Sequence, residues 1–269
     1  MPAAPAAPAG TLRRLGQGSI RFRLPPRIVA GFTVVGPMEG KGPMAGYMDT
    51  VLEDTYYGER CWERTESKML KEAVQNALRQ ARLQEADVDL SFTADMLGQL
   101  VASSFAMRSS TLPHVGIYSA CASFAGALAL AGMAVEGGFA RRAVVAASSH
   151  HDAAERQYRF PTELGVQRPP TSQWTVTGAG AVVVSGEASD QGVLVTEATF
   201  GRVMDMGIKD PFDMGTAMAP AAADTLVRHL QHTGRRLEDF DLVLTGDLGR
   251  VGSRVFLDWL EERHGVSLD

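Results

Sequence analysis

Hydrophobic and polar positions follow two different periods along this chain. Apolar residues recur at helical spacing over residues 67–83 and again over residues 221–231, which predicts two amphipathic helices. Around them lie short apolar runs rich in β-branched residues and bounded by glycine or serine, which are typical of buried strands. Strands that alternate with helices predict an α/β protein built in layers. The predicted strand regions are 26–36, 141–150, 177–186 and 192–203.

One stretch of the chain occurs twice. DVDLSFTADML at residues 87–97 resembles DFDLVLTGDLG at residues 239–249, with five identical positions in register, and both follow an amphipathic helix. We expect a buried strand in each stretch, followed by a turn and another helix. The likeness predicts a duplicated half, because repeated sequence signals repeated architecture. Two βα units of similar composition are the alternative explanation.

The repeat divides the chain into three parts. Residues 1–26, which open with MPAAPAAPAG, are expected to be a flexible tail and lead-in; residues 27–187 form an N-terminal half and residues 188–269 a C-terminal half. The boundary falls in the turn-rich stretch GEASDQG. The first half continues through two strand regions after Cys121, whereas the chain ends soon after the helical stretch SRVFLDWLEERHG. The second half is therefore expected to be incomplete at its C-terminus.

Composition and charge argue against several classes of protein. The chain has 45% hydrophobic residues and a net charge of −5, without a cluster of lysine and arginine, so we expect no nucleic-acid partner. The uncharged run 118–135 is slightly short for a membrane span, consists of small residues and is closed by Glu136, which predicts a buried helix instead. The cysteines fit neither a disulfide framework nor a zinc site, so we expect cytoplasmic synthesis and neither metal nor cofactor.

Cys121 lies between the β-type stretch HVGIYSA and an alanine- and glycine-rich helical run. At such an elbow the helix dipole and free backbone N–H groups would lower the pKa of the thiol, and the same N–H groups could hold a carboxylate or polarise a carbonyl. The small residues Ala122 and Ser123 would let a ligand approach the backbone. We expect Cys121 to be mostly buried and to face a cleft between the two halves. The alternative is a cysteine that only packs in a core.

A second group of candidate ligand residues follows the strand at 141–150. His150 and His151 are adjacent, and neighbours in a strand point to opposite faces, so one of them can face a site but the two make a poor metal pair. The next segment, 152–174, is rich in arginine and aromatic residues, and its length and prolines predict an ordered loop over a site. The arginines could instead pair with glutamates of the same segment. The candidates in this loop are Arg156, Tyr158, Arg168 and Trp174.

These motifs resemble a known superfamily. The stretch YSACASFAGALALA is similar to the nucleophile elbow of the thiolase superfamily, in which a duplicated α/β half carries a cysteine at a buried helix N-terminus. More narrowly, RQYRFPTELGVQRPPTSQWTVTGAGA and GIKDPFDMGTAMAPAAADTL resemble the stage V sporulation protein AD family, and the resemblance runs from about residue 28 to the C-terminus. It implies a thiolase-like duplicated layered α/β fold.

The resemblance also implies a function and partners. Members of that family bind dipicolinic acid as a component of its channel in bacterial spores, for uptake in sporulation and with a further role in release at germination. The implied partners are dipicolinic acid, free or as its calcium chelate, and membrane proteins of the SpoVA complex; a homodimer is compatible with this. The implied location is peripheral, at the spore inner membrane. Dipicolinic acid is a flat pyridine dicarboxylate, which suits bidentate arginines, a stacking aromatic ring and backbone N–H groups.

Catalysis is expected to be lost. In ketoacyl-synthase relatives a histidine follows the strand equivalent to DLVLTG, whereas this chain has Asp247 in that turn. An ionised aspartate cannot donate to an oxyanion and would repel a nearby thiolate. We therefore expect a non-catalytic binding protein; the alternatives are a condensing enzyme for acyl thioesters that uses Cys121, and a structural scaffold. The expected ligand-binding residues are Cys121, Ala122, Ser123, His150, Arg156, Tyr158, Arg168, Trp174 and Asp247.

Overall fold

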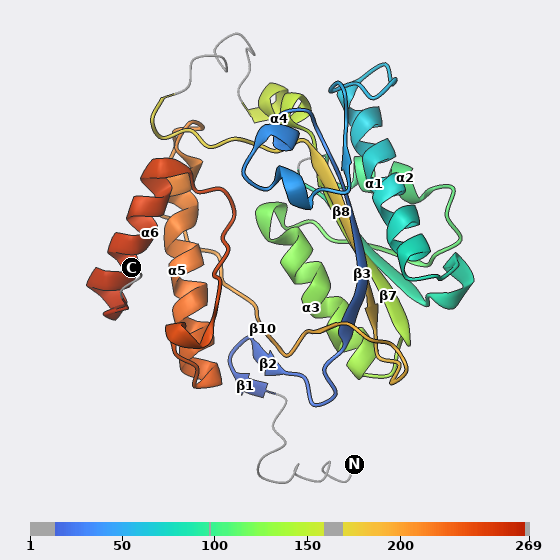
Figure 1. Cartoon of the computed structure of the whole chain (residues 1–269). Helices are drawn as coiled ribbons and strands as arrows, with labels where there is room; N and C mark the ends of the chain where they lie inside the picture. The colour runs from blue at the N-terminus through green and yellow to red at the C-terminus, as the bar shows by residue number, and fades with distance from the viewer. Residues whose placement is uncertain (1–13, 97, 159–168, 267–269) are drawn as a thin grey trace, which may run out of the picture.

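The computed structural model describes residues 14–96, 98–158 and 169–266 (Figure 1). Helices form over both segments with helical periodicity, and strands form in the four apolar runs, as predicted. The helices are α1 (Trp62–Gln80), α2 (Val101–Met107), α3 (Ser123–Glu136), α4 (His151–Tyr158), α5 (Met214–Thr233) and α6 (Gly249–His264). The strands are β1 (Arg14–Gly16), β2 (Ser19–Arg21), β3 (Arg27–Val35), β4 (Thr50–Val51), β5 (Leu90–Asp95), β6 (His114–Gly116), β7 (Arg142–Ser149), β8 (Gly178–Ser185), β9 (Val193–Leu194) and β10 (Glu197–Thr199).

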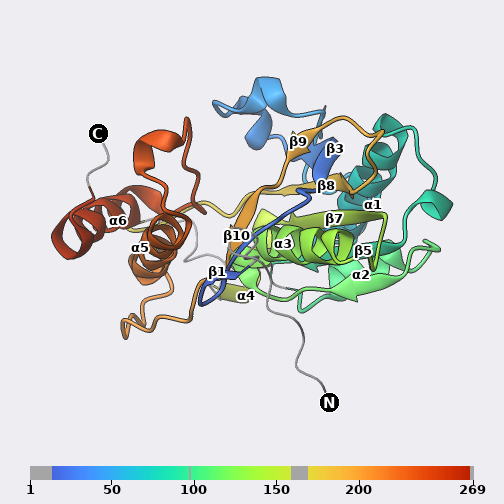
Figure 2. The same ribbon diagram turned by 90° about the horizontal axis from the view of Figure 1, so that it is seen from below.

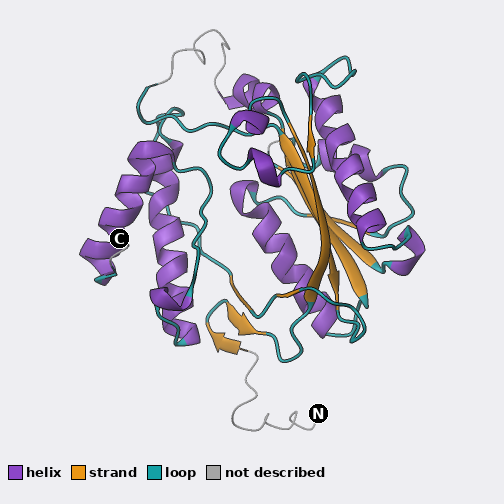
Figure 3. Cartoon of the chain, viewed as in Figure 1, coloured by secondary structure: helices purple, strands orange, loops and turns teal. Residues whose placement is uncertain are grey.

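The main sheet has seven strands and mixed directions (Figure 3). Its order is β4-β3-β8-β7-β5-β6, and β9 pairs with β3 at one end. Strand β8 is antiparallel to both β3 and β7, whereas β3 is parallel to β4, and β5 is parallel to both β7 and β6. Parallel neighbours need crossover connections. Helix α2 connects β5 to β6, and α3 connects β6 to β7 across β5.

Both faces of this sheet are covered by helices, which explains the nearly continuous apolar runs of its strands. On one face, buried residues of α1 and α2 pack against Val144 and Ala146 of β7. On the other face, α3 packs against Ala143 and Val145 of the same strand. The side chains of β7 thus alternate between two cores, as the pleat of a strand requires. The uncharged run centred on α3 forms the helix of the second core.

Helices α5 and α6 form a separate pair with its own apolar core, beside α3 and away from the main sheet (Figure 2). Their backbones approach each other at two glycines. A Cβ built on Gly215 would lie 1.9 Å from the carbonyl oxygen of Leu248, and one on Gly252 would lie 2.6 Å from the backbone of Gly215. Such distances leave no room for a side chain at either position.

The sequence repeat is also a structural repeat. Helix α5 begins at Met214, 152 residues after the start of α1 at Trp62, and the 3-10 turn Leu237–Asp239 (η6) lies 152 residues after its counterpart Glu85–Asp87 (η3). Both 3-10 turns are closed by the same reciprocal side-chain and backbone contacts at their ends.

One prediction from this repeat is wrong. The first copy forms β5, but residues 241–248 form no strand, although the copies share five identities. A strand needs neighbours that accept and donate its backbone hydrogen bonds. Strand β5 has β6 and β7 beside it, whereas within residues 14–96, 98–158 and 169–266 no strand pairs with the second copy.

The expected flexible lead-in is also corrected, for residues 14–21. Strands β1 and β2 form a small antiparallel sheet with β10. Ser19 on β2 is buried and contacts Thr199 Oγ1 at 2.9 Å and His232 Nδ1 at 2.8 Å, so the hairpin is joined to both β10 and α5. The sequence did not predict this hairpin, because it is short and polar, follows a low-complexity stretch, and pairs with residues about 180 positions away.

Candidate functional site

The elbow at Cys121 has the predicted shape. Strand β6 ends at Gly116, the 3-10 turn Ala120–Ala122 (η4) contains the cysteine, and α3 begins at Ser123. Ala120 has φ +45°, a left-handed conformation that is costly for a residue with a side chain. The backbone N–H of Ser119 donates to the buried Ser123 Oγ at 3.0 Å, which closes the loop. The hydroxyl of Ser123 therefore holds the elbow in shape.

The expected burial of Cys121 is wrong, because both Cys121 and Ala122 are exposed. The thiol does point to the second half: Cys121 Sγ lies 3.9 Å from Met218 Sδ on α5, and a Cβ built on Gly246 would lie 3.8 Å from Cys121 Cβ. The turn is open to solvent, whereas the sulfur, which faces Met218, is partly desolvated. The cysteine thus lies between the halves without being enclosed by them.

The thiol is not activated in the way that an elbow suggests. Loss of water around the sulfur raises the pKa of Cys121, and a backbone hydrogen bond opposes this only in part. The expectation of a lowered pKa is therefore wrong in direction. Among the described residues, the hydrogen-bond partner of the sulfur is Met218, which cannot accept a proton from it as a base would.

Asp247 and Trp174 are brought together beside this elbow. Asp247 Oδ2 accepts a hydrogen bond from the backbone N–H of Trp174 at 2.9 Å, and its Oδ1 accepts one from Gly249 N–H, the first residue of α6, at the same distance. The Trp174 ring stacks on His151 with centroids 3.9 Å apart and planes 5° apart. A cavity of about 460 Å³ is lined by Trp174, Asp247, Gly249 and Arg250.

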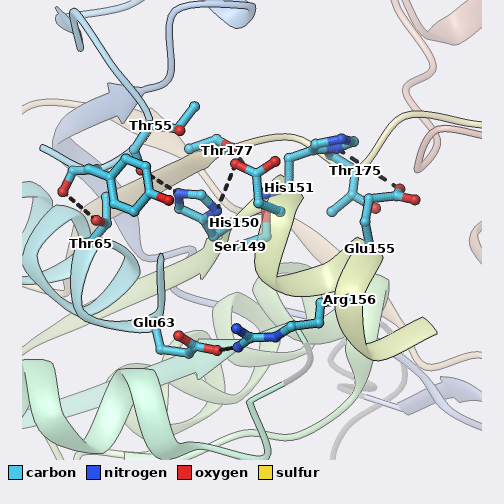
Figure 4. Close-up of polar contacts among 12 residues, drawn as sticks. Thr55, Glu63, Thr65, Ser149, His150, His151, Glu155, Arg156, Thr175 and Thr177 are labelled. Carbon is cyan, nitrogen blue, oxygen red and sulfur yellow. Dashed lines mark hydrogen bonds and ion pairs between the residues drawn. The ribbon is translucent and has the colours of Figure 1, made fainter. Parts of the chain in front are cut away.

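His150 and Arg156 lie on the other side of α4 and do not join that group (Figure 4). His150 is buried, its Nε2–H donates to the carbonyl oxygen of Thr55 at 2.8 Å, and desolvation lowers its pKa. Arg156 forms an ion pair with Glu63 and lies over the Trp62 ring at 5.4 Å. The charge of Arg156 is thus neutralised by a glutamate of α1, outside its own segment.

The two remaining candidates are Tyr158 and Arg168. Tyr158 is the last residue of α4 and is half-buried. Arg168 lies outside the described residues. The structure therefore divides the predicted set into the elbow at Cys121, the neighbouring pair Trp174 and Asp247, and the separate residues His150 and Arg156.

Two buried carboxyl groups near His150 were missed by the sequence analysis. Glu66 on α1 is buried, and Ser148 Oγ donates to its Oε1 at 3.0 Å; burial raises the pKa of Glu66 to about 7. Asp95 at the end of β5 accepts hydrogen bonds from Leu100 N–H and from Ser103, at 3.0–3.1 Å. The burial of Glu66 could have been predicted from the sequence, because Glu66 precedes Leu70 by one helical turn and so lies on the apolar stripe of the predicted helix.

Neither a metal site nor a membrane-spanning helix is found within the part of the chain that the structure describes. No group of three or more histidine, cysteine, aspartate or glutamate side chains gathers as a metal site would require. No described helix is both long and apolar enough to cross a membrane.

The fold is that of thiolase-like condensing enzymes. A cerulenin-bound variant of OleA from Xanthomonas campestris matches with a TM-score of 0.64 and 15% identity, over 93% of this chain and 83% of that one. The 3-oxoacyl-[acyl-carrier-protein] synthase III from Aquifex aeolicus matches with a TM-score of 0.55 and 17% identity, over 90% of this chain and 81% of that one. Identities this low establish the shared fold alone.

A closer relationship is evident from sequence. The stage V sporulation protein AD of Bacillus subtilis (strain 168) is 41% identical over 251 residues, which are 93% of this chain and 74% of that protein. The family model for stage V sporulation protein AD matches residues 16–269, which includes the β1–β2 hairpin, the cysteine elbow and both repeated units. The chain therefore belongs to the stage V sporulation protein AD (SpoVAD) family of sporulation proteins.

Proposed function

We propose that this chain is a non-catalytic binding protein for dipicolinic acid, free or as its calcium chelate, and that it works with membrane proteins of the SpoVA complex at the spore inner membrane. The observation that carries the non-catalytic part is the contact of the cysteine: its sulfur meets Met218 Sδ, and no base is hydrogen-bonded to it among the described residues. Desolvation, which raises the pKa of the thiol, acts in the same direction. Membership of the SpoVAD family supports the sporulation context.

The role of Asp247 supports the same conclusion. Both of its carboxylate oxygens accept backbone N–H groups, one of which begins α6. The aspartate thus supports a helix start and the Trp174 backbone, at the turn where a condensing enzyme needs a proton donor.

The proposed ligand site is the cavity beside the elbow, lined by Trp174, Asp247, Gly249 and Arg250. Its volume of about 460 Å³ lies within the usual range for small-molecule sites. Arg250 is exposed and its guanidinium suits a carboxylate, while the indole of Trp174 suits a flat ring. The N-terminus of α3 follows the elbow directly, and its helix dipole favours a second carboxylate.

Calorimetry with dipicolinic acid, with and without calcium chloride, tests this site. We expect Arg250→Ala and Ala122→Trp to weaken binding by about tenfold or more, because the first removes a charge-assisted hydrogen bond and the second fills the approach to the elbow. The matched control is Arg254→Ala, which should bind as the wild type does. Arg254 lies one turn further along α6, is exposed and pairs with Asp258. Absence of binding to the wild type, or equal binding by all variants, would refute the proposed site.

The second candidate function is condensation of acyl thioesters at Cys121, which the thiolase-like fold favours. Short acyl-CoA donors followed by mass spectrometry distinguish it. An acyl adduct on Cys121, with turnover that disappears in Cys121→Ser, would establish the enzyme. We expect neither, because Cys121 lacks a base among the described residues and has a raised pKa.

A further inference from the structure

A second cavity, of about 330 Å³, lies on the far side of α4 from Trp174. It is enclosed by α1, α4, the end of β7 and the start of α2, and the exposed residues Val101, Arg156 and Gln157 lie on its wall, so it is open to solvent. Apolar residues form much of its lining, and Glu63, Glu66, Ser149 and His150 supply polar groups. This cavity is separate from the proposed dipicolinate site, and the two share no lining residue.

The polar atoms left free in this cavity are acceptors. His150 donates its Nε2–H to the carbonyl oxygen of Thr55, so its Nδ1 carries a lone pair, and this buried atom has no hydrogen-bond partner among the described residues. Ser149 Oγ donates to the carbonyl oxygen of Val176 at 2.7 Å and, as the neighbour of Ser148 in β7, lies on the opposite face of the sheet from Glu66. Glu66 receives one hydrogen bond, from Ser148, at Oε1. Among the described residues that line the cavity, the guanidinium is that of Arg156, and it is paired with Glu63 (Figure 4).

The electrostatic balance at Glu66 also favours a positive guest. Glu66 is 5% exposed and faces Asp95 on β5, whose charge acts on it, and Ser148 on β7. The other charged groups around the cavity are Glu63 on α1, Arg156 on α4, which offsets Glu63, and Asp152 near His150. Desolvation keeps His150 neutral by lowering its pKa. Glu66 has no cationic side chain among the causes that act on it within the described residues, so this buried carboxyl would ionise more readily if a cation entered.

We propose that this cavity is a binding site for a small organic cation, namely a primary ammonium group on a short apolar chain. The ammonium group pairs with the Glu66 carboxylate, and His150 Nδ1 supplies a further acceptor for one of the three ammonium donors. The apolar chain lies against Met96, Val101 and Ala102. The volume, at the small end for ligand sites, limits the guest to a few carbon atoms.

Binding of n-butylammonium chloride, followed by calorimetry and by ligand-observed NMR, tests this inference. Its neutral and anionic counterparts, n-butanol and butyrate, are the comparison ligands. We expect the cation to bind most tightly at a pH well above 7, and its affinity to fall about tenfold per unit below the pKa of Glu66, because binding then requires the carboxyl to lose its proton. Equal binding of the cation and n-butanol, or no binding of the cation, would overturn the proposal.

Two variants locate the site. Glu66→Gln keeps the shape and the contact with Ser148 but removes the charge, so we expect at least about tenfold weaker binding and loss of the pH dependence. Val101→Trp fills the cavity mouth from an exposed position and should block the cation even if Glu66→Gln fails to fold. Glu53→Gln, at an exposed position outside the cavity, is the matched control. Unchanged affinity in both cavity variants would contradict the proposal, and none of these outcomes depends on dipicolinate binding.

Discussion

The first repeated unit runs from α1 through η3 and β5 to α2, and the second from α5 through η6 and residues 241–248 to α6. Their starts are 152 residues apart, yet their middle segments differ completely in surroundings. Phe92 in the first unit is 7% exposed, whereas Leu244, its counterpart by register, is 79% exposed. An apolar strand sequence therefore becomes a strand only where other strands complete its hydrogen bonds and neighbouring elements cover its side chains.

The aspartates that end the two segments behave alike in spite of this difference. Asp95 accepts N–H groups of Leu100 and Ser103 at the start of α2, and Asp247 accepts the N–H of Gly249 at the start of α6. In both units the repeated aspartate thus accepts backbone N–H groups at the start of the helix that follows, although it is not the N-cap residue itself. A local contact of this kind survives in both copies, because it needs no partner from a distant part of the chain.

The largest expected effect comes from the apolar residues of the two segments. Phe92→Ala should lower the free energy of unfolding by about 3–5 kcal/mol, because it opens a cavity between the sheet and α3. Leu244→Ala should change it by less than about 0.5 kcal/mol, because that side chain is already in water. Urea denaturation of both variants gives the comparison. Similar losses in the two variants would mean that residues 241–248 are covered in solution.

Replacing the aspartates Asp95 and Asp247 should give two losses of unfolding free energy that differ by less than those of the first pair. Asp95→Ala should cost about 2–4 kcal/mol, since Asp95 and Ser103 are fully buried and the freed N–H groups lose their acceptor. Asp247→Ala should lower the free energy of unfolding by about 1 kcal/mol, which is typical for an exposed side chain that accepts an N–H group at a helix start. Melting temperatures of the two variants, measured side by side, test this order. An equal or larger loss for Asp247→Ala would contradict this order, and would show that the hydrogen bond to Trp174 contributes more stability than the one to Gly249.

Glu66 gives the first unit a pH dependence that the second unit lacks at the matching position, which is Met218. The pKa of Glu66 is raised from 4.5 to about 7, so the folded protein binds a proton that the unfolded chain releases between these values. Stability should therefore fall as pH rises through this window, by up to about 3 kcal/mol at 1.36 kcal/mol per pKa unit. In Glu66→Gln the fall should be absent, so the difference between variant and wild type should grow with pH and level off above 7. A constant difference across this range would contradict the assigned pKa.

The smallest expected pair of effects concerns glycines in helices. Gly252→Ala should destabilise the protein by about 1–3 kcal/mol, because α5 and α6 would have to move apart at Gly215. Gly126→Ala in α3 should instead stabilise it by about 0.5–1 kcal/mol, since a Cβ there meets nothing within 4 Å and alanine suits a helix interior. Thermal unfolding measures both changes. A neutral Gly252→Ala would mean that the second unit does not depend on close packing of its helix pair.

Part of the site could be inferred from sequence, and the elbow is the best example. The β-type stretch, the small residues and the helical run placed Cys121 between β6 and α3, and the repeat placed Asp247 before α6. The direction of the thiol pKa could not be inferred, because it depends on how Met218 and other distant groups exclude water from the sulfur. The pairing of Arg156 with Glu63 was equally hidden, since the two residues are 93 positions apart.

Hydrophobic period and motif are local properties of the chain, and they were enough to predict α1, α3, α5 and α6, the strands β3, β5, β6, β7 and β8, the repeat and the family. They did not predict α4: residues 151–158 were expected as a strand end and a loop, and form a helix instead. The packing of distant segments decides that DLSFTADML pairs as β5 while DLVLTGDLG stays unpaired, that residues 14–21 join β10, and that His150 and Arg156 turn away from Trp174 to line a second cavity with Glu66. Backbone pairing, burial and side-chain direction all depend on what the rest of the chain brings alongside, and that information is not contained in any single segment.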